Sequence, residues 1–279
     1  MEKFKLENPI PKRRLGKTGV EVTILGLGGE GALRSYGRDK EAVDLISAAL
    51  DLGINYMESA RAYSGSETYY GQALKGRRDK VFLATKSHAR DRKGALAHLE
   101  ESLSNLKTDH LDLWYVHDMR TAEEVEAIGA PGGALDAFKE AKDKGLVKFI
   151  GVTGHQDPLI IKKCLDIFDF DVALVPVNPA EPQHKCFLEE IVPAAGGKDI
   201  GIVGMKVYLK GLIEAPKKLL FNYALTQPIA TAAIGCDNIE QMNDNAEIAS
   251  TFFNLKYKEV QRLTDIISPY ARELMYYKP

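Results

Sequence analysis

The sequence contains eight short apolar runs that are spaced almost evenly along the chain. Each run has the length and residue types of a buried β-strand. The runs end at Gly28, Glu58, Lys86, His117, Thr153, Asn178, Met205 and Gly235. Successive ends are 25 to 36 residues apart, which leaves room for one crossover helix in every interval. Eight parallel strands connected in this way predict an α/β protein with a (β/α)8 TIM barrel.

Amphipathic patterns fill the intervals between these runs. In the first of them apolar residues recur at helical spacing, and Gly53 supplies a C-terminal stop. The predicted helices span residues 39–52, 67–75, 93–106, 135–144, 159–168, 188–195, 219–225, 239–248 and 256–270. Residues 13–22 predict an N-terminal β-hairpin that caps one end of the barrel. Because no linker-like stretch divides the chain, we expect a single barrel domain over residues 1–279 with a C-terminal helical extension.

Two segments are expected to be irregular. Residues 118–134 contain the string Gly129-Ala130-Pro131-Gly132-Gly133, which favours an extended, mobile loop over the C-terminal ends of the strands. Tyr276 and Tyr277 lie close to the last residue and could fold back over the pocket, but a frayed tail is the expectation there. Residues 34–38, residues 117–134 and the tail are the segments that should select a substrate, but their sequences do not specify which one.

Composition narrows the possible partners. The 279 residues are 45% hydrophobic and 27% charged, with a net charge of −2. This balance gives no reason to expect nucleic acid or an anionic membrane as a partner. No apolar run is long enough to cross a bilayer, and the first residues are too polar for a signal peptide, so we expect a cytoplasmic protein. The three cysteines are scattered and no HxH or HExxH spacing occurs, so no metal site is predicted. A monomer or weak oligomer is expected.

Three consecutive strand-like runs end on ionisable residues. They are Glu58, Lys86 and His117, and Tyr63 follows the first of them by five residues. Parallel strands bring their C-terminal ends to one face of a barrel, so these side chains are expected to meet in one pocket. There the ammonium of Lys86 would lower the pKa of the Tyr63 phenol, Glu58 would hold the lysine, and His117 would bind a carbonyl oxygen. A hydride donor would have to be a cofactor.

The ordered set of acid, tyrosine, lysine and histidine resembles the catalytic tetrad of the aldo-keto reductases. The turn Gly26-Leu27-Gly28-Gly29 and the string from Val147 to His155 are also similar to that family. The resemblance implies a barrel enzyme that reduces an aldehyde or ketone with NAD(P)H, with Tyr63 as general acid. It also implies cofactor contacts at Gly28, Gly29, Glu30, Thr153, Gly154, Met205, Lys206 and Asn245.

Some positions near the implied nicotinamide site depart from the usual pattern of that family. Glu58 replaces the usual Asp and is one methylene longer. The usual Ser-Asn pair corresponds to Thr153-Gly154, the usual Gln corresponds to Leu174, and Met205 replaces a stacking aromatic residue. The resemblance therefore implies fewer polar contacts to the nicotinamide amide than is usual.

The implied adenosine side departs as well. Residues 235–242 contain no Lys or Arg, and Asp237 would repel a 2′-phosphate, so NAD(H) is expected to be slightly favoured over NADP(H). The strings Thr153-Gly154-His155 and Gly204-Met205-Lys206 are closer to a branch whose members often carry a C-terminal iron-sulfur segment. Because no cysteine follows Cys236, that cluster is expected to be absent.

Two other interpretations stay open at this point. The reduced set of nicotinamide contacts is also compatible with a non-catalytic or regulatory barrel that binds a nucleotide or small ligand without turnover. A Schiff-base lyase that uses Lys86 or Lys206 as its amine is a third possibility.

Overall fold

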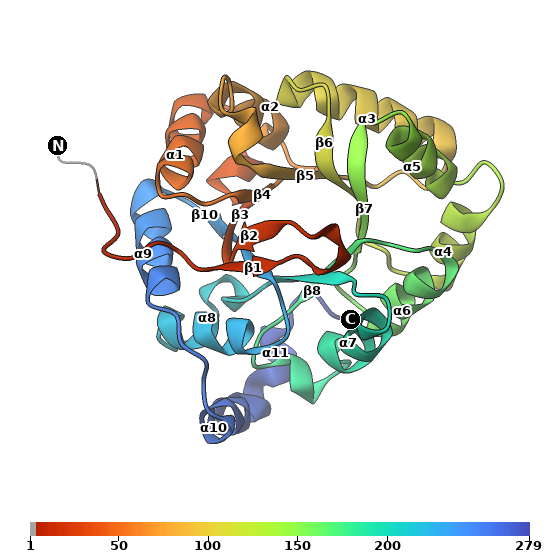
Figure 1. Cartoon of the computed structure of the whole chain (residues 1–279). Coiled ribbons are helices and arrows are strands. Elements are labelled where there is room, and N and C mark those ends of the chain that lie inside the picture. Colours follow the sequence, from red (N-terminus) through yellow and green to blue (C-terminus); the bar gives the residue numbers. More distant parts are fainter. Residues whose placement is uncertain (1–3) are drawn as a thin grey trace.

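The computed structural model describes residues 4–279 and has a closed barrel of eight parallel strands at its centre. The barrel strands are β3 (Leu25–Gly31), β4 (Tyr56–Glu58), β5 (Phe82–Ser87), β6 (Leu111–Val116), β7 (Val147–Thr153), β8 (Val172–Pro176), β9 (Gly201–Met205) and β10 (Thr231–Cys236). Neighbours in the chain pair in order, and β10 closes the barrel by pairing with β3 (Figure 1). The predicted (β/α)8 barrel is confirmed, and the strands differ from the predicted runs only at their ends.

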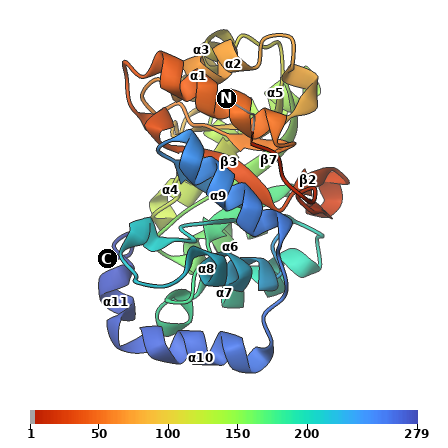
Figure 2. The same ribbon diagram turned by 90° about the vertical axis from the view of Figure 1, so that its left-hand side faces the viewer.

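The predicted N-terminal hairpin is also confirmed. Strands β1 (Lys12–Arg14) and β2 (Glu21–Thr23) pair antiparallel, and the 3-10 helix η1 (Gly16–Thr18) lies between them. Leu15 is fully buried against Gly201 at the start of β9, where an added Cβ would lie 2.8 Å from Leu15 Cδ1. The hairpin therefore covers the end of the barrel at which the strands begin, and the C-terminus lies on the opposite side (Figure 2).

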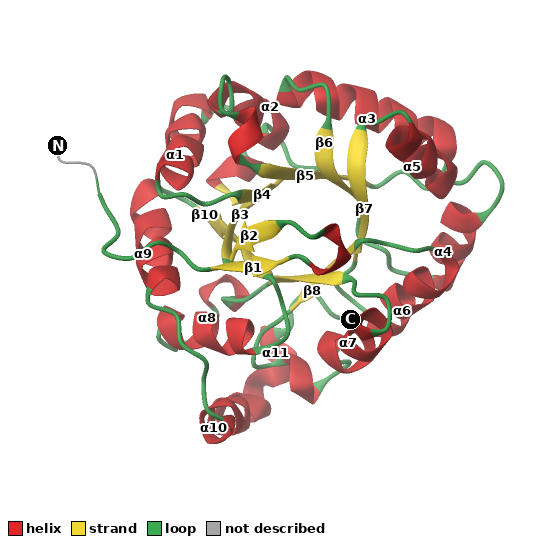
Figure 3. Ribbon diagram, viewed as in Figure 1, coloured by secondary structure: helices red, strands yellow, loops and turns green. Residues whose placement is uncertain are grey.

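A ring of helices surrounds the barrel (Figure 3). These helices are α1 (Asp39–Asp51), α2 (Ser66–Ala73), α3 (Arg92–Leu106), α4 (Ala122–Gly129), α5 (Ala134–Asp143), α6 (Pro158–Ile167), α7 (Phe187–Gly196), α8 (Lys217–Thr226) and α9 (Ile239–Ser250). Beyond them the chain continues through α10 (Tyr257–Ile267), η6 (Ser268–Tyr270) and α11 (Ala271–Leu274). Side-chain caps fix several starts: Asp91 accepts from the Gly94 N–H at α3, and Asn238 accepts from the Gln241 N–H at α9.

The loop predicted over residues 118–134 is in part wrong, because α4 occupies its middle. Thr121 caps this helix by accepting from the Glu124 N–H at 3.3 Å. Val125 and Ile128, three positions apart, are its buried residues. The glycines that suggested a loop lie at the end of α4 and beyond it, where Gly132 has a φ of +79°. They end the helix rather than prevent it.

The core has two layers, one inside the barrel and one between barrel and helices. Inside, the Tyr56 and Tyr115 hydroxyls lie 2.9 Å apart, and Tyr56 stacks on Phe82. Outside, Trp114 of β6 stacks on Phe138 of α5 with ring centroids 3.7 Å apart. Trp114 thus packs between barrel and helix. Alternation of inward and outward residues along each strand supplies both layers.

The C-terminal residues dock on the barrel, so the expectation of a frayed tail is wrong. The Lys278 ammonium is fully buried and donates to Glu181 Oε2 at 2.8 Å and to the His184 and Lys185 carbonyls. Tyr277 donates to Glu181 Oε1 at 2.7 Å. Because these partners lie more than ninety positions earlier in the chain, no local pattern marks the contact. The buried Glu181 carboxylate holds the tail in place.

Among residues 4–279, no helix is sufficiently long and apolar to cross a membrane.

Replacing Lys278 by Met should loosen the C-terminal segment. The substitution leaves the Glu181 carboxylate buried without its counter-ion, which costs on the order of 3 kcal/mol. Denaturant unfolding and hydrogen exchange across residues 257–279 would measure the effect. Lys258→Met, on the exposed side of α10, is the matched control and should change neither. Equal unfolding midpoints for the two variants would contradict the stabilising role of the buried pair.

Candidate active site

A cavity of about 550 Å³ opens at the C-terminal ends of the barrel strands. The four residues predicted to form a tetrad line it together: Glu58, Tyr63, Lys86 and His117. Most of the predicted cofactor residues line it as well, namely Gly28, Glu30, Thr153, Met205, Lys206 and Asn245. Its size is typical of a small-molecule or cofactor site.

The centre of the cavity is an ion pair between Glu58 and Lys86. Because β4 and β5 are neighbours, their ends place the two side chains in direct contact. The exposed fraction is 2% for the Lys86 side chain and 7% for that of Glu58. Lys86 Nζ also donates to the Ser59 carbonyl at 2.8 Å, and Glu58 Oε1 accepts from the Gly29 N–H at 3.2 Å. The longer glutamate therefore contacts the lysine through Oε2 while Oε1 keeps a hydrogen bond to the backbone.

Burial and the ion pair act on Lys86 in opposite directions. Burial lowers the pKa of Lys86 because it penalises the charged ammonium. The adjacent Glu58 carboxylate favours the charged form, as does the more distant Glu30. The lysine thus depends on Glu58 to stay protonated.

Tyr63 lies on the turn after β4, beside the lysine. Lys86 Nζ is 4.8 Å from the centroid of the tyrosine ring. Gly29 permits this approach, since an added Cβ would lie 2.9 Å from Tyr63 Cδ2 and from the Glu58 carbonyl oxygen. Burial raises the pKa of Tyr63, and the negative charge of Glu30 adds to the rise. The predicted lowering of that pKa by Lys86 is not found here, because the loss of solvation has the larger effect.

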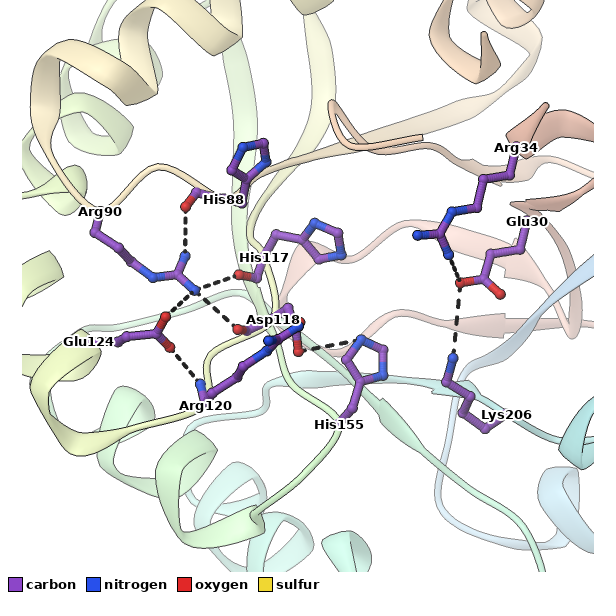
Figure 4. A network of polar contacts seen from close by, with 10 residues as sticks. All are labelled: Glu30, Arg34, His88, Arg90, His117, Asp118, Arg120, Glu124, His155 and Lys206. Atoms are coloured by element: carbon purple, nitrogen blue, oxygen red, sulfur yellow. Dashed lines mark hydrogen bonds and ion pairs between the residues drawn. The ribbon is translucent and has the colours of Figure 1, made fainter. Parts of the chain in front are cut away.

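His117 follows β6 and completes the group. Its ring meets the Tyr63 ring edge to face, with centroids 5.9 Å apart. Burial, followed by the charge of Lys86, lowers the pKa of His117 well below its ordinary value, so the imidazole is neutral at neutral pH. Arg90 donates to the His117 and Asp118 carbonyl oxygens at 3.0 and 3.1 Å and holds this turn (Figure 4). A neutral, fixed imidazole is suited to donate a hydrogen bond to an oxygen in the cavity.

Charged groups surround the mouth of the cavity. Glu30 accepts from Arg34 at 3.1 Å and lies 4.0 Å from Lys206 Nζ (Figure 4). On the other side His155 Nε2 is 3.7 Å from Asp118 Oδ1. Burial, with the charge of Lys206 next, lowers the pKa of His155 to about 4.

Two predicted cofactor residues lie behind the cavity surface. Gly29 packs against Tyr63 and Ser66. Gly154 lies between Ile161 and Met119, where an added Cβ would be 2.7 Å from Ile161 Cδ1 and 2.8 Å from the Met119 carbonyl oxygen. The backbone at residue 154 therefore has no room for the asparagine side chain that the family pattern would place there.

The remaining lining residues fit an extended cofactor. Thr153 offers a hydroxyl and Met205 an apolar surface near the tetrad, and Leu174 lies beside them. At the far end Asn245 is buried and held by the Tyr208 hydroxyl at 3.0 Å. The cavity runs from the tetrad to Asp237 and the start of α9, so a long nucleotide could lie along it.

Two lining residues come from distant segments: Tyr276, which sequence reasoning placed in a frayed tail in preference to the pocket, and Lys210, which it did not single out. Tyr276 lines the cavity because the tail is docked, and its ring lies under the ammonium groups of Lys210, 4.4 Å away, and Lys206, 5.7 Å away. Lys210 lies in η5 (Leu209–Gly211), where nothing in the local pattern distinguishes it from a solvated lysine. Among residues 4–279, no group of His, Cys, Asp or Glu is arranged to hold a metal ion.

Comparisons with a family model, with curated proteins and with solved structures all find aldo-keto reductases or oxidoreductases. The family model described as "Aldo/keto reductase family" matches residues 24–218. The uncharacterised oxidoreductase YqkF of Bacillus subtilis (strain 168) is 30% identical over 293 residues, covering 86% of this chain and 91% of that protein. The solved holo form of aldo-keto reductase AKR11C1 from Bacillus halodurans superposes with a TM-score of 0.79 at 24% identity, covering 92% and 96% of the two chains. The Klebsiella pneumoniae aldo-keto reductase solved with NADPH has a TM-score of 0.75 at 19% identity, covering 92% and 95%.

The contacts of Gly154 predict that even a methyl group there is costly. Gly154→Ala should reduce the free energy of unfolding by about 1–3 kcal/mol, because Ile161 and the backbone of Met119 must shift. Gly196→Ala is the matched control: it lies at the exposed end of α7, with no atom within 4 Å of an added Cβ. Denaturant unfolding of both variants measures the difference. A Gly154→Ala protein as stable as the control would contradict the packing described.

Proposed function

The chain belongs to the aldo/keto reductase family and is an NAD(P)H-dependent oxidoreductase of carbonyl compounds, and we propose that Tyr63 protonates the carbonyl oxygen during reduction. The observation that carries this proposal is the position of Tyr63, whose ring lies near both the Lys86 ammonium and the His117 ring in one cavity. The Schiff-base alternative is not favoured, since Lys86 is engaged by Glu58 and by the Ser59 carbonyl, and Lys206 lies 4.0 Å from the Glu30 carboxylate.

Each of the four residues has a distinct part in the proposed reaction. The His117 imidazole, being neutral, donates a hydrogen bond to the carbonyl oxygen and orients it beside the phenol. Tyr63 keeps its proton in the resting site, because burial raises its pKa. As negative charge develops on the substrate oxygen, the phenol releases its proton and Lys86 stabilises the phenolate that remains. Glu58 keeps the lysine charged and in place.

The bound nicotinamide cofactor supplies the hydride that these side chains cannot provide. We propose that Thr153 and Met205 hold its nicotinamide end, with Gly28 allowing close approach of the β3 backbone. Asn245 is proposed to hold the adenosine end. Lys210 and Lys217 line the same cavity and are the cations proposed to meet its phosphates.

We further propose a modest preference for NAD(H) over NADP(H). Asp237 lines the end of the cavity next to α9. Its backbone N–H donates to the Gln241 side chain at 2.9 Å, which fixes the loop that carries the carboxylate. A 2′-phosphate near this carboxylate would be repelled.

Replacing Tyr63 by Phe should reduce kcat by roughly 10²- to 10⁴-fold, because the proton donor is lost. Binding of the reduced cofactor should persist, and quenching of protein fluorescence measures it separately from the rate. Tyr257→Phe, at a residue that is 78% exposed at the start of α10, is the control and should retain full activity. A Tyr63→Phe protein with nearly the rate of the parent would rule out the proposed role. A parent protein that binds cofactor but reduces no carbonyl compound would instead favour the non-catalytic barrel.

Asp237→Asn should narrow the difference in affinity between NADH and NADPH. Removing the negative charge relieves the repulsion of a 2′-phosphate, so the Kd for NADPH should fall several-fold while that for NADH changes little. Titration with both reduced cofactors provides the measurement, and Asp244→Asn on the exposed face of α9 is the control. Tighter binding of NADPH than of NADH by the parent protein would contradict the preference.

A further inference from the structure

Arg34 lies directly over the proposed proton donor. Its Cζ is 4.9 Å from the centroid of the Tyr63 ring, and its side chain is half-exposed. Figure 4 shows it directed from the rim toward the Glu30 carboxylate, to which it donates through Nη1 at 3.1 Å. The guanidinium makes no other hydrogen bond to the residues that the structure describes. An arginine offers five N–H donors, so most of them are available to a ligand.

The segment that carries Arg34 is held rigidly. Arg34 ends the 3-10 helix η2 (Ala32–Arg34), whose first two residues are buried. The Tyr69 hydroxyl donates to the Ser35 carbonyl at 2.6 Å and accepts from the Arg38 N–H at 3.2 Å, so it fixes the chain just after the arginine. A guanidinium on such a segment is preorganised, which lowers the entropic cost of binding.

The charges at this side of the mouth do not balance. Arg34 and Lys206 share the single carboxylate of Glu30, at 3.1 and 4.0 Å. Of the other carboxylates of the site, Glu58 contacts Lys86, and Asp118 accepts from Arg120 Nε at 2.8 Å. Asp237 lies at the far end of the cavity, where Lys210 and Lys217 also line it. The rim beside Tyr63 therefore carries more positive than negative charge, and an anionic group placed there would be attracted.

We propose that the preferred substrate is a carbonyl compound bearing a carboxylate, which Arg34 binds at the rim while the carbonyl oxygen faces Tyr63. The inference rests on the proposed function and adds the substrate class to it. A planar carboxylate matches the donor fork of a guanidinium better than a hydroxyl or an alkyl group does. The contact with Glu30 already shows this guanidinium holding a carboxylate in the site.

A different role for Arg34 is to neutralise Glu30 and nothing more. In that case its removal would disturb the reduction of charged and uncharged substrates equally. The two roles are therefore separated by substrates that differ in charge and resemble each other in shape. The anion 4-formylbenzoate and its methyl ester form such a pair, because both present the same aromatic aldehyde.

The test compares kcat/KM for these two aldehydes in the parent protein, Arg34→Gln, Arg34→Lys and Arg14→Gln. The parent should prefer the acid. Arg34→Gln should lose roughly 10- to 100-fold on the acid and far less on the ester, as expected for a lost hydrogen bond to a charged group. For the acid, the kcat/KM of Arg34→Lys should lie between those of the parent and Arg34→Gln, because lysine keeps the positive charge but lacks the paired N–H donors of a guanidinium. Arg14, paired with Asp199 on the surface of the N-terminal hairpin at the opposite end of the barrel, is the matched control, and its replacement should leave both values unchanged.

A parent protein that prefers the ester, or an Arg34→Gln protein that loses both activities equally, would overturn the inference. In either case, reduction of the ester that depends on Tyr63 would leave the proposed function intact. If neither aldehyde is reduced, calorimetry tests the carboxylate site by measuring ligand binding to the protein with reduced cofactor. Benzoate should then bind more tightly than benzamide, and Arg34→Gln should abolish the difference; equal binding by the parent would reject the carboxylate site.

Discussion

The buried ion pair between Glu58 and Lys86 is the interaction on which the site depends. Removing a carboxylate and an ammonium from water costs several kcal/mol for each ion, and only close contact with further hydrogen bonds offsets it. Both requirements are met, because adjacent parallel strands end on these residues and the Gly29 N–H and the Ser59 carbonyl supply the additional bonds. The glutamate satisfies two partners at once, so its extra methylene relative to aspartate is accommodated within the barrel.

Burial sets the protonation states around this pair. It favours the uncharged form of every group, so it raises the pKa of Tyr63 and lowers those of His117 and Lys86. Of these three groups, Lys86 alone has a carboxylate in direct contact, and that contact keeps its ammonium charged. The resting site thus combines a protonated phenol, a neutral imidazole and an ammonium, which suits proton donation to an oxygen that gains negative charge.

The parts that the sequence predicts correctly are those determined by neighbouring residues. Strand-like runs and helical spacing locate the barrel, and parallel pairing then brings Glu58, Lys86 and His117 to one face without further information. The prediction fails where distant contacts decide the structure. Helix α4 is stabilised by the burial of Val125 and Ile128 against other elements, which its own residues do not determine. The tail is held by Glu181, which lies 97 positions before Lys278. The pKa of Tyr63 could not be predicted from its neighbours, because the degree of burial outweighs the nearby charge.

The residues at the rim of the cavity are held in place by different contacts from those at its floor. The tetrad is positioned by strand ends, whereas Arg34 depends on the Tyr69 hydroxyl, and Tyr276 depends on the buried Lys278–Glu181 pair. These anchors do not belong to the barrel hydrogen-bond ladder, so a change in the rim need not move Tyr63 or Lys86. Substrate selection and proton donation are thus carried by separately supported parts of the structure. One barrel can then keep its chemistry while the groups that recognise the substrate change.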